Sequence, residues 1–511
     1  MDPQGRIPPI WVGRFVRIII ASRKSDLARI QAQSVGEALK KKNPELKIEY
    51  NFRESLGDKN LQDPLWKMPE KGVFTQDFYD DLISSKVDMV VHSWKDLPIE
   101  ERSETQIVAT LPRADQRDLL LVKKSSWEGA KAHRELKVFS SSPRRAYNLE
   151  GFLREVLPGD FENVSFESVR GNVPTRVQKL NASDSVHGLI VAKAAIDRLL
   201  SAQGQEYLKM QRELREVLKN CLVMVLPLEK NPSAAAQGAL AIEIKTGRQE
   251  ILQLLEGINC KKTFSEVREE RKRLKEYGGG CHQKVGISVR VRDYGEIVYT
   301  RAFTDQNIKV DKVEFYSATQ KISKATLKNI FPEPGVRAQF FRREALDIDI
   351  PPGPLWVSKD EALPDGVVPQ DRLIWVSGIE TWKKLAKRGV WVTGCNEGLG
   401  ESEANHLEDL FGPLKWTKLS HTEGHQGQIK SLGKILGTYK LIPLKTLPDL
   451  QNKTHFYWTS GSSFLLALKA YPEIKKAHHF CGPGNTYEII SKEVPVTIFP
   501  KYEQWKEAIL K

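Results

Sequence analysis

The chain has 511 residues, of which 40% are hydrophobic and 28% charged, a composition typical of a globular protein with roughly three or four domains. It contains no apolar run near the roughly 18 residues of a membrane-spanning helix, and its N-terminus, "MDPQGRIPPIWVGRF", lacks the apolar region of a secretory signal. Five dispersed cysteines without a CxxC pair argue against a zinc finger or a disulfide framework, so we expect a cytoplasmic protein without a metal.

The formal net charge of +13 predicts that the protein attracts anions. In nucleic-acid-binding proteins, basic residues are usually interleaved with aromatic ones or carried by a recognisable motif. The densest basic run here, "KKTFSEVREERKRLKEY", instead alternates in sign and is typical of a salt-bridged helix face. The charge therefore indicates either a solvated basic surface or a small polyanion as ligand, and we expect neither nucleic acid nor a membrane as partner.

After an N-terminal arm over residues 1–15, strand-like runs alternate with amphipathic helices as far as about residue 240. Runs such as "VRIII", "VDMVV", "LKVF" and "HGLIV" each lead into a polar loop or a helix. In the helix after "ASRKS", Ala28, Ala32, Val35 and Leu39 recur at helical spacing. Alternating strands and helices predict parallel α/β domains, whose ligands bind outside the carboxyl ends of the strands.

The pattern changes twice further along the chain. The stretch "ISVRVRDYGEIVYTRAF", residues 287–303, predicts two alternating strands joined by a turn from Asp293 to Gly295, in a small α+β domain. The proline-rich stretches "FPEPG" and "DIDIPPGPLW" then fit a linker. Past about Pro354 the α/β pattern returns in "RLIWVSG", "GVWVTGCNEG" and "HFYWTSGSS".

Two arginines follow a predicted helix start in "SSSPRRAYNL". Pro143 suits the first helical position, so Ser142 is expected to cap the helix. Arg144 and Arg145 then lie in the first turn, where the helix dipole disfavours cations. An anion would offset this cost, because helix N-termini bind anions and arginine binds carboxylates through two hydrogen bonds. The alternative is a pair of surface arginines.

Other predicted strand ends are basic as well. "RGNVPTR" puts Arg170 and Arg176 on either side of a turn, and "ASRKS" puts Arg23 and Ser25 after another strand. A duplex of nucleic acid would more naturally be met by one continuous basic stripe. Several strand-end arginines on domains of one type therefore predict a ligand with several carboxylates.

Two stretches hold chemically distinctive residues. "VHSWKDLP" puts Lys95 and Asp96 directly after an apolar strand. Among cations Asp96 is expected to stay ionised, and it could stabilise a cationic intermediate or transfer protons; capping the turn before Pro98 is the alternative. "YGGGCHQKVG" puts Cys281 directly after three glycines. The residues alone allow five interpretations of this cysteine: a metal ligand, a redox thiol, a nucleophile, an attachment point or a residue without a role.

Seven motifs occur in the order found in porphobilinogen deaminases, also called hydroxymethylbilane synthases: "ASRKSDLARIQA", "LGDKNLQDPLWKMPEKGVF", "VDMVVHSWKDLP", "SSSPRR", "RGNVPTR", "AAQGALAIE" and "GGGC". The chain resembles that family over roughly residues 16–290. The resemblance implies two periplasmic-binding-protein-like α/β domains with the active cleft between them. Domain 1 is expected over 16–115 with 222–245, domain 2 over 116–221, and a small α+β domain carrying the cofactor cysteine over 246–335.

The resemblance also implies a chemistry. Porphobilinogen units are joined head to tail, with loss of ammonia, into a linear tetrapyrrole of heme biosynthesis. The family carries a dipyrromethane cofactor, held through a thioether to the cysteine of "GGGC", which is Cys281 here. Asp96 matches the catalytic aspartate, which stabilises positively charged pyrrole intermediates and assists proton transfers. The expected partners are small-molecule substrates, and the protein is expected to be a monomer.

The remaining site residues are basic or hydroxyl-bearing positions that match the same motifs. Those expected to bind the cofactor are Ser25, Lys67, Lys95, Ser140, Ser142, Arg144, Arg145 and Arg170. Those expected to bind the acetate and propionate groups of the substrate are Arg23, Arg170, Arg176 and Arg198.

The chain departs from the family pattern at several positions. Pro69 and Glu70 replace two glycines before Lys71, which bears on the mobility of that loop. Lys284 replaces a usual proline after the cysteine, and Pro143 replaces a common leucine. None of these changes removes a residue with an assigned role.

Beyond an expected linker over 336–353, residues 354–511 resemble uroporphyrinogen-III synthase, the next enzyme of the pathway. The motifs are "FYWTSGSSFLLAL" and "FCGPGNTYEII", and "GTYKLIPL" is similar to that family's central tyrosine region. The segment is short for a two-lobed synthase, so one lobe is expected to be reduced. The resemblance implies ring closure of the linear product. Its candidate residues are Tyr439, Ser460, Ser462 and Thr486.

We therefore expect a bifunctional enzyme of tetrapyrrole synthesis, a deaminase followed by a cyclising synthase. The alternatives are a deaminase with a degenerate or regulatory C-terminal α/β domain, and a protein that only binds polycarboxylates. Asp96 and Cys281 discriminate between enzyme and binding protein, because a binding protein needs neither.

Overall fold

The computed structural model describes residues 17–54, 76–278, 284–304, 306–319, 322–336, 338–366, 371–401, 403, 405–424 and 433–510. The expected N-terminal arm and two candidate site residues, Lys67 and Cys281, lie outside these ranges. Among the residues within them, no helix is long and apolar enough to cross a membrane.

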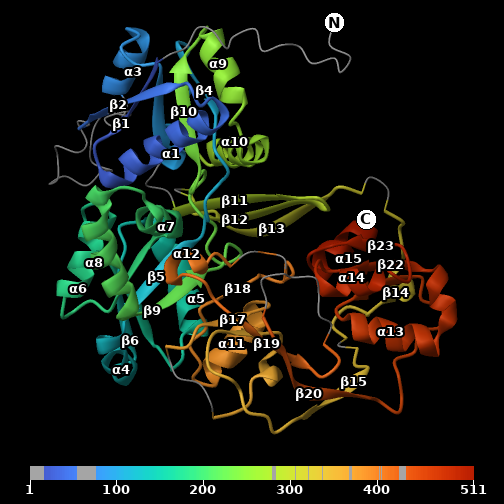
Figure 1. The fold of residues 1–511 in the computed structure, drawn as a ribbon. Helices are drawn as coiled ribbons and strands as arrows, with labels where there is room; N and C mark the ends of the chain where they lie inside the picture. Colours follow the sequence, from blue (N-terminus) through green and yellow to red (C-terminus); the bar gives the residue numbers. More distant parts are fainter. Residues whose placement is uncertain are drawn as a thin grey trace, which may run out of the picture.

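A five-stranded sheet in the order β2-β1-β3-β10-β4 forms the first α/β unit, at the top of Figure 1. Its strands are β1 (Arg17–Arg23), β2 (Lys47–Arg53), β3 (Met89–Ser93), β4 (Thr105–Ala109) and β10 (Leu240–Lys245). Its helices are α1 (Asp26–Lys42), α3 (Gln76–Ile83) and α9 (Gln249–Glu256). Successive side chains of β1 point to opposite faces of the sheet. Ile18 and Ile20 therefore pack against α1 and α9 on one face, and Ala21 packs against α3 on the other. We call residues 17–109 with 240–256 domain 1.

A second five-stranded sheet has the order β7-β6-β8-β5-β9. Its strands are β5 (Asp118–Lys123), β6 (Glu135–Phe139), β7 (Asn163–Glu167), β8 (Gly188–Ala192) and β9 (Cys221–Leu226). Its helices are α4 (Lys124–Ala132), α5 (Pro143–Val156), α6 (Val173–Ala182), α7 (Lys193–Ser201) and α8 (Leu208–Lys219). Leu120 and Val122 pack with α4 and α5, and Leu119 and Leu121 pack with α6, α7 and α8. We call residues 118–226 domain 2.

The chain passes between these domains through residues 110–117 and 227–239, which we call the crossing segments. Strand β9 pairs with β5 along its whole length and therefore belongs to domain 2, so the expected assignment of residues 222–226 to domain 1 is wrong. The reason is that β9 is buried at every position, and a strand buried on both faces carries no pattern that indicates its sheet. The expected α/β class of both domains is confirmed.

Helix α10 (Lys261–Glu276) and an antiparallel sheet form domain 3, residues 261–317. The strands of this sheet are β11 (Lys284–Arg292), β12 (Gly295–Phe303) and β13 (Lys309–Ser317). Strands β11 and β12 pair in register around the turn at Asp293 and Tyr294, which confirms the predicted hairpin. Strand β13 was not predicted, because it lies at the sheet edge and most of its side chains are at least partly exposed.

The rest of the chain forms two α/β lobes. Lobe A, residues 341–443, contains β15 (Phe341–Ala345), β16 (Leu355–Val357), β17 (Ile374–Val376), β18 (Gly394–Cys395), β19 (Thr417–His421), β20 (Ile435–Pro443), α11 (Ile379–Lys387) and α12 (Glu408–Phe411). Lobe B, residues 330–331 with 455–510, contains β14 (Ile330–Phe331), β21 (His455–Trp458), β22 (His478–Cys481), β23 (Val496–Ile498), α13 (Gly461–Ala470), α14 (Asn485–Ile490) and α15 (Tyr502–Leu510).

The expected linker over 336–353 is corrected by these sheets. Strand β15 lies inside it and pairs antiparallel with β20, and β14, expected in domain 3, pairs parallel with β21. The chain therefore forms a first strand of lobe B, then all of lobe A, and then the rest of lobe B. Both lobes of the expected two-lobed architecture are present. Proline-rich composition concealed β15, since prolines flank an edge strand without interrupting it.

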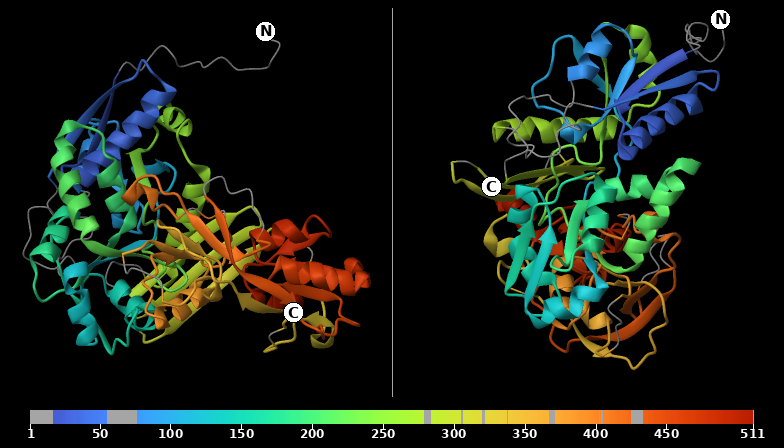
Figure 2. Two further views of the ribbon diagram at one scale, coloured as in Figure 1. Left: turned by 60° about the horizontal axis from the view of Figure 1, so that its bottom comes forward. Right: turned by 90° about the vertical axis from the view of Figure 1, so that its left-hand side faces the viewer.

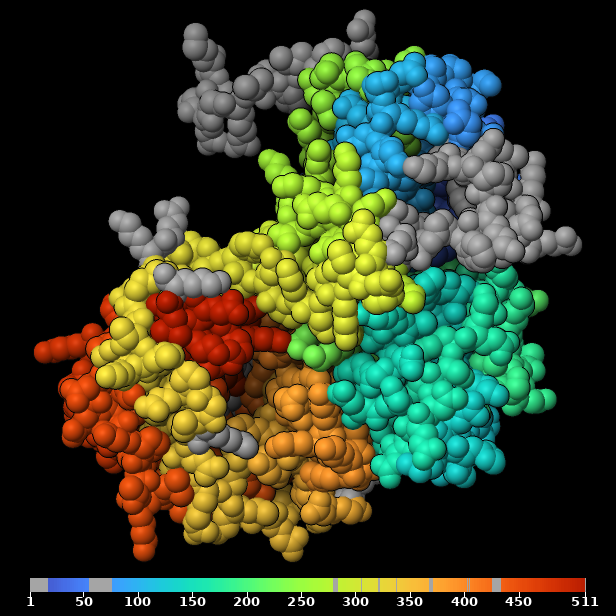
Figure 3. All heavy atoms as spheres, turned by 180° about the vertical axis from the view of Figure 1, so that it is seen from behind, coloured from blue at the N-terminus to red at the C-terminus, as the bar shows by residue number. Residues whose placement is uncertain are grey.

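Lobe A packs directly on domain 2, as Figures 1 and 2 show. One hydrophobic core spans both, and within it the rings of Trp127 and Trp391 meet edge to face with centroids 5.0 Å apart. Val225 of β9 donates its backbone N–H to Thr393 O at 2.7 Å, at the edge of lobe A. Seen from behind, domains 2 and 3 and the two lobes form one continuous surface (Figure 3).

Candidate active site

The turn after β3 carries Lys95 and Asp96. Both lie on one 3₁₀ turn (Trp94–Asp96), which the buried Trp94 anchors by packing on Phe264. Lys95 is half-buried, and its Nζ donates to Gln237 Oε1 at 3.3 Å. Asp96 is exposed. The strand end of domain 1 therefore presents a carboxylate beside an ammonium group.

Charges of both domains act on this ammonium group. Burial lowers the pKa of Lys95, Asp96 opposes that shift, and Arg145 and Asp118 of domain 2 also influence it. The carboxyl ends of strands from two different sheets are thus close enough to share one electrostatic environment.

Helix α5 begins as the sequence predicts. Ser142 is its N-cap and accepts a hydrogen bond from the backbone N–H of Arg145, and Pro143 occupies the first turn. Arg144 and Arg145 are both buried, and both donate to Asp118, at 2.9 and 2.6 Å. The anion that the two arginines require is therefore present in the protein itself.

Asp118 is the functional residue that sequence reasoning missed. It is wholly buried and accepts two further hydrogen bonds, from Asn231 at 2.9 Å and from Gln237 at 2.8 Å. Burial alone would raise its pKa, but Arg145 and Arg144 outweigh burial and hold that pKa well below its usual range. The signal in the sequence was an acid at the start of "DLLLV", where a buried charge needs partners.

The two arginines differ in what remains for a ligand. Arg144 Nη1 donates to Asn231 Oδ1 and Pro232 O, at 3.0 and 2.7 Å, and its Nη2 is bound to Asp118. Arg145 Nε, by contrast, is buried and has no hydrogen-bond partner among the described residues. Arg145 Nη1 donates to Ile190 O at 3.3 Å, so Nε is the nitrogen of Arg145 that has no described partner.

Arg170 and Arg176 complete the charged cluster. Arg176 is half-buried, and its Nε donates to Gly171 O at 2.7 Å. Burial lowers its pKa, Arg145 and Arg170 lower it further, and Asp96 raises it. The residues that act on one another here are Lys95, Asp96, Arg145, Arg170 and Arg176. Among the described residues these cations outnumber the carboxylates Asp96 and Asp118, and such an excess fits a ligand with several carboxylates.

Four other candidates lie at strand ends or domain boundaries. Arg198 donates to Gly238 O at 2.6 Å and so joins α7 to a crossing segment, and burial lowers its pKa to about 10. Ser140 is buried at the end of β6, and its Oγ accepts the Ser142 N–H at 3.4 Å. Arg23 ends β1, and Ser25 precedes α1. The bonds described for these four do not connect them to Asp96.

Cys281 lies outside the described residues, and strand β11 begins after it at Lys284. The ammonium of Lys284 lies over the ring of Phe303, 5.1 Å from its centroid, and near Tyr147 of α5. A Cβ at Gly286 would come within 2.3 Å of Pro232 O, which itself accepts from Arg144. Strand β11 therefore begins against the helix that carries the buried arginines.

The four candidates in the C-terminal half do not form one group. Ser460 caps α13, where its Oγ accepts the Ser463 N–H at 3.4 Å, and Ser462 lies in the first turn. Thr486 lies in the first turn of α14, so these three share the carboxyl edge of lobe B. Tyr439 is buried on β20 of lobe A, where burial raises its pKa.

A family model described as porphobilinogen deaminase, dipyromethane cofactor binding domain, matches residues 18–253. The porphobilinogen deaminase of Syntrophomonas wolfei is 34% identical over 267 residues, which cover 52% of this chain and 78% of that protein. The porphobilinogen deaminase of Clostridium novyi is 30% identical over 271 residues, covering 53% of this chain and 83% of that protein.

Among solved structures, a periplasmic sulfonate-binding protein from Methylobacillus flagellatus is similar with a TM-score of 0.27 and 14% identity, covering 51% of this chain and 72% of that one. A score of this size carries no argument, so the family rests on the sequence relatives and the family model. The chain therefore belongs to the porphobilinogen deaminase family and is a transferase of tetrapyrrole biosynthesis with a dipyrromethane cofactor.

Proposed function

We propose that the chain joins four porphobilinogen units head to tail, with loss of one ammonia for each. One water then cleaves the bond between the tetrapyrrole and the cofactor and supplies the terminal hydroxyl of hydroxymethylbilane. The observation that supports this most is that cations from two domains surround Asp96. Lys95 lies beside it in the same turn, and the charge of Asp96 raises the pKa of Arg176. Each substrate unit carries an acetate and a propionate group. A growing chain of such units therefore needs several cations and one carboxylate that can move protons.

Asp96 is the catalytic residue in this proposal. Loss of ammonia from a substrate unit leaves a positively charged pyrrole, and an ionised carboxylate stabilises that charge. The same carboxylate can accept the proton that is released once the new carbon–carbon bond has formed. Arg145 and Arg176 would bind carboxylates of the ligand and fix the reacting unit beside Asp96.

Cys281 is proposed to hold the dipyrromethane through a thioether, and this group supplies the pyrrole carbon to which the first unit is joined. Arg144, which makes three hydrogen bonds inside the protein, is proposed to support Arg145 as well as to hold the cofactor. The side chains proposed to hold the cofactor are Ser25, Lys67, Lys95, Ser140, Ser142, Arg144, Arg145 and Arg170. Those proposed to hold the substrate are Arg23, Arg170, Arg176 and Arg198.

Intact-mass measurement of the purified chain tests the attachment. We expect a mass increase that corresponds to one dipyrromethane and is located in the peptide containing Cys281. The increase should be lost in Cys281→Ser and kept in the matched variant Cys260→Ser, whose thiol lies at the start of α10. An unmodified wild-type mass would contradict the attachment.

Turnover tests Asp96. Asp96→Asn should keep the added mass and lose a factor of roughly 10² to 10⁴ in kcat. If kcat fell less than about tenfold, Asp96 would not carry the chemistry.

We also propose that the two lobes cyclise the linear product to uroporphyrinogen III. Supporting this are the presence of both lobes and the location of Ser460, Ser462 and Thr486 at one carboxyl edge of a parallel sheet, where α/β proteins bind ligands. The extensive packing of lobe A on domain 2 equally favours the alternative that the C-terminal half has only a structural role.

Supplying porphobilinogen and identifying the cyclic isomer separates these two possibilities. A synthase gives uroporphyrinogen III, whereas spontaneous closure of hydroxymethylbilane gives only the isomer I. Formation of isomer I alone, at a normal rate of porphobilinogen consumption, would refute the synthase proposal and leave the deaminase proposal intact.

A further inference from the structure

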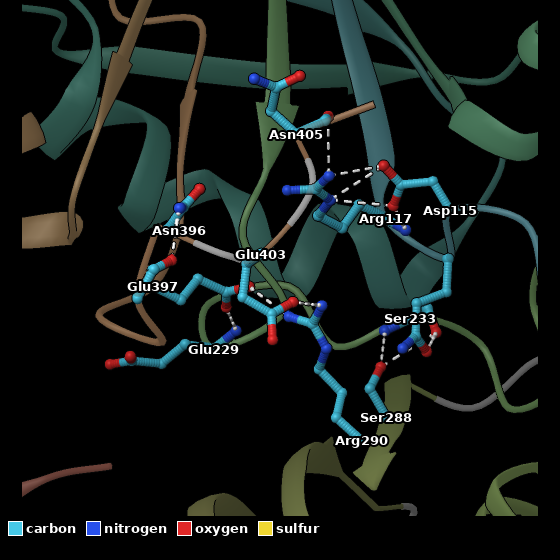
Figure 4. Close-up of polar contacts among 12 residues, drawn as sticks. Asp115, Arg117, Glu229, Ser233, Ser288, Arg290, Asn396, Glu397, Glu403 and Asn405 are labelled. Carbon is cyan, nitrogen blue, oxygen red and sulfur yellow. Dashed lines mark hydrogen bonds and ion pairs between the residues drawn. The ribbon is translucent and has the colours of Figure 1, made fainter. Parts of the chain in front are cut away.

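The loop between β18 and α12 leaves lobe A and reaches into the deaminase domains. We call its described residues, 396–401, 403 and 405–407, the bridging segment. Figure 4 shows the side chains of Glu397 and Glu403 and the carbonyl of Asn405 directed at residues from the crossing segments and domain 3.

Glu403 of the bridging segment binds two arginines of β11. Its Oε1 accepts from Arg292 Nε at 2.6 Å, and its Oε2 accepts from Arg292 Nη2 at 2.9 Å and from Arg290 Nη2 at 2.6 Å. All three side chains are less than one-fifth exposed. Burial alone would raise the pKa of Glu403, but Arg290 and Arg292 reverse this and lower it. Glu403 therefore carries its charge at neutral pH.

The same segment binds the first crossing segment. Arg117 donates to Asn405 O at 3.1 Å while its guanidinium pairs with Asp115 at 2.7 Å. Lys193, which is wholly buried at the start of α7, donates to His406 O at 2.7 Å. One cation of the first crossing segment and one of domain 2 thus donate to backbone carbonyls of the C-terminal half.

The second crossing segment is bound as well. Glu397 is buried and accepts the backbone N–H of Glu229 at 2.7 Å, and its carboxylate lies 3.7 Å from Arg290. The backbone of Glu397 has a φ of 54°, in the left-handed region that favours glycine. A buried acid held in a costly backbone conformation indicates that its contacts compensate for the strain.

These contacts involve two parts of the deaminase: the crossing segments and strand β11. The crossing segments are the described stretches of chain that connect domains 1 and 2. Strand β11 begins three residues after Cys281 and continues past the crossing segment, where Ser288 Oγ accepts the Ser233 N–H at 2.8 Å. Buried charge pairs resist separation because each lost partner leaves an unsolvated charge.

We propose that Glu403 is a positioning residue of the deaminase, which fixes β11 to the crossing segments through Arg290 and Arg292 and so makes the C-terminal half a working part of the first enzyme. This rests on the proposed attachment at Cys281. The growing oligopyrrole is tethered next to β11, and each addition must bring its end back to Asp96. A β11 that is held less firmly should slow additions after the cofactor has been loaded.

Glu403→Gln is the test variant, because it keeps the size of the side chain and removes the charge shared by the two arginines. The matched control is Glu314→Gln, since Glu314 also pairs with an arginine of domain 3, Arg273 at 3.0 Å, but without the C-terminal half. Arg292→Lys is a milder second variant, because it keeps the charge and loses the paired hydrogen bonds.

With Glu403→Gln we expect full loading with dipyrromethane by intact mass and a KM within about twofold of wild type. We expect kcat to fall roughly 10- to 100-fold, the size that a misplacement near 1 Å produces. Under limiting porphobilinogen, chains carrying one to three added units should accumulate in the mass spectrum. Arg292→Lys should shift the same distribution by a smaller amount, and Glu314→Gln should match wild type.

Three results would overturn the proposal. One is an unchanged kcat and chain-length distribution in Glu403→Gln. Another is an equal effect in Glu314→Gln, which would indicate general destabilisation of domain 3. The third is failure of both Glu403→Gln and Arg292→Lys to load the cofactor, which would make Glu403 necessary for folding and not for positioning. Added mass on a wild-type peptide other than that of Cys281 would instead refute the attachment.

Discussion

Asp118→Asn gives the most direct test of how the buried arginine pair is stabilised. Each carboxylate oxygen of Asp118 accepts two hydrogen bonds: Oδ1 from Arg145 and Gln237, and Oδ2 from Arg144 and Asn231. Asparagine replaces one oxygen by an NH₂ group. Whichever way the amide lies, two buried donors then face another donor and lose their acceptor.

The cost follows from burial. Arg144 and Arg145 are only 4% and 7% exposed, so water does not replace the lost carboxylate charge. Removing one partner of a buried ion pair costs about 3–5 kcal/mol, and an unsatisfied buried donor costs roughly 1–3 kcal/mol. Because both costs fall on the same groups they are not additive. We expect the free energy of local unfolding to fall by about 3–5 kcal/mol.

The sign of the pH dependence is also determined. The pKa of Asp118 is lower in the folded protein than in the unfolded chain, so its contribution to stability is present above the unfolded pKa of about 3.9 and is lost as the pH falls below it. Between about pH 5 and 8 the carboxylate is ionised in both states. The difference between wild type and Asp118→Asn should therefore be constant over that range.

Native-state hydrogen exchange of the amides of α5 and β5 measures this local free energy. The control is Glu150→Gln on the same helix, whose ion pair with Arg154 spans 3.9 Å and is about half exposed, and it should change the free energy by less than about 0.5 kcal/mol. A change below about 1 kcal/mol in Asp118→Asn would mean that the two arginines do not depend on this carboxylate. That result would refute the reasoning.

Further predictions concern the C-terminal half. His479 is buried with both ring nitrogens hydrogen-bonded, and burial lowers its pKa. The free energy of unfolding of lobe B, measured by hydrogen exchange, should therefore fall as the pH drops below about 6.5. His479→Gln should make this free energy depend less on pH. Trp382→Ala removes a buried ring that packs on Phe152 of domain 2, so thermal unfolding should show lobe A and domain 2 losing stability together, by about 3–5 kcal/mol; separate transitions with domain 2 unchanged would contradict this. Gly400 has a φ of 97°, and a Cβ on it would come within 2.9 Å of Gly484, so Gly400→Ala should speed exchange at the contact between the lobes.

The parts of the fold that the sequence predicts are those set by local pattern. Alternation and helical spacing identify the strands and helices of domains 1 and 2, and the Ser142 cap before Pro143 occurs as expected. The hairpin of β11 and β12 turns where Asp293 and Tyr294 indicate. In each case the residues that make the structure are near neighbours in the chain.

The parts that the sequence does not predict depend on partners far away in the chain. Strand β9 has no feature that assigns it to domain 2, because every position is buried. The role of Asp118 depends on Asn231 and Gln237, more than a hundred residues later. Glu403 lies in a stretch that carried no motif, and its two arginines lie over a hundred residues earlier.

Asp118 also bears on the order in which the site can form. The proposed ligand carries several carboxylates and comes from outside the chain, so the cations that bind it must be folded before it arrives. Lys95, Arg145, Arg170 and Arg176 would then repel one another with only Asp96 among them. A buried carboxylate that holds Arg144 and Arg145 removes part of that repulsion without using the ligand, while Arg145 Nε has no partner in the part of the chain that the structure describes. Asp118 therefore allows the two arginines of "SSSPRR" to be buried before a ligand binds. The positive charge that Asp118 does not neutralise is then available to the carboxylates of the proposed pyrrole chain.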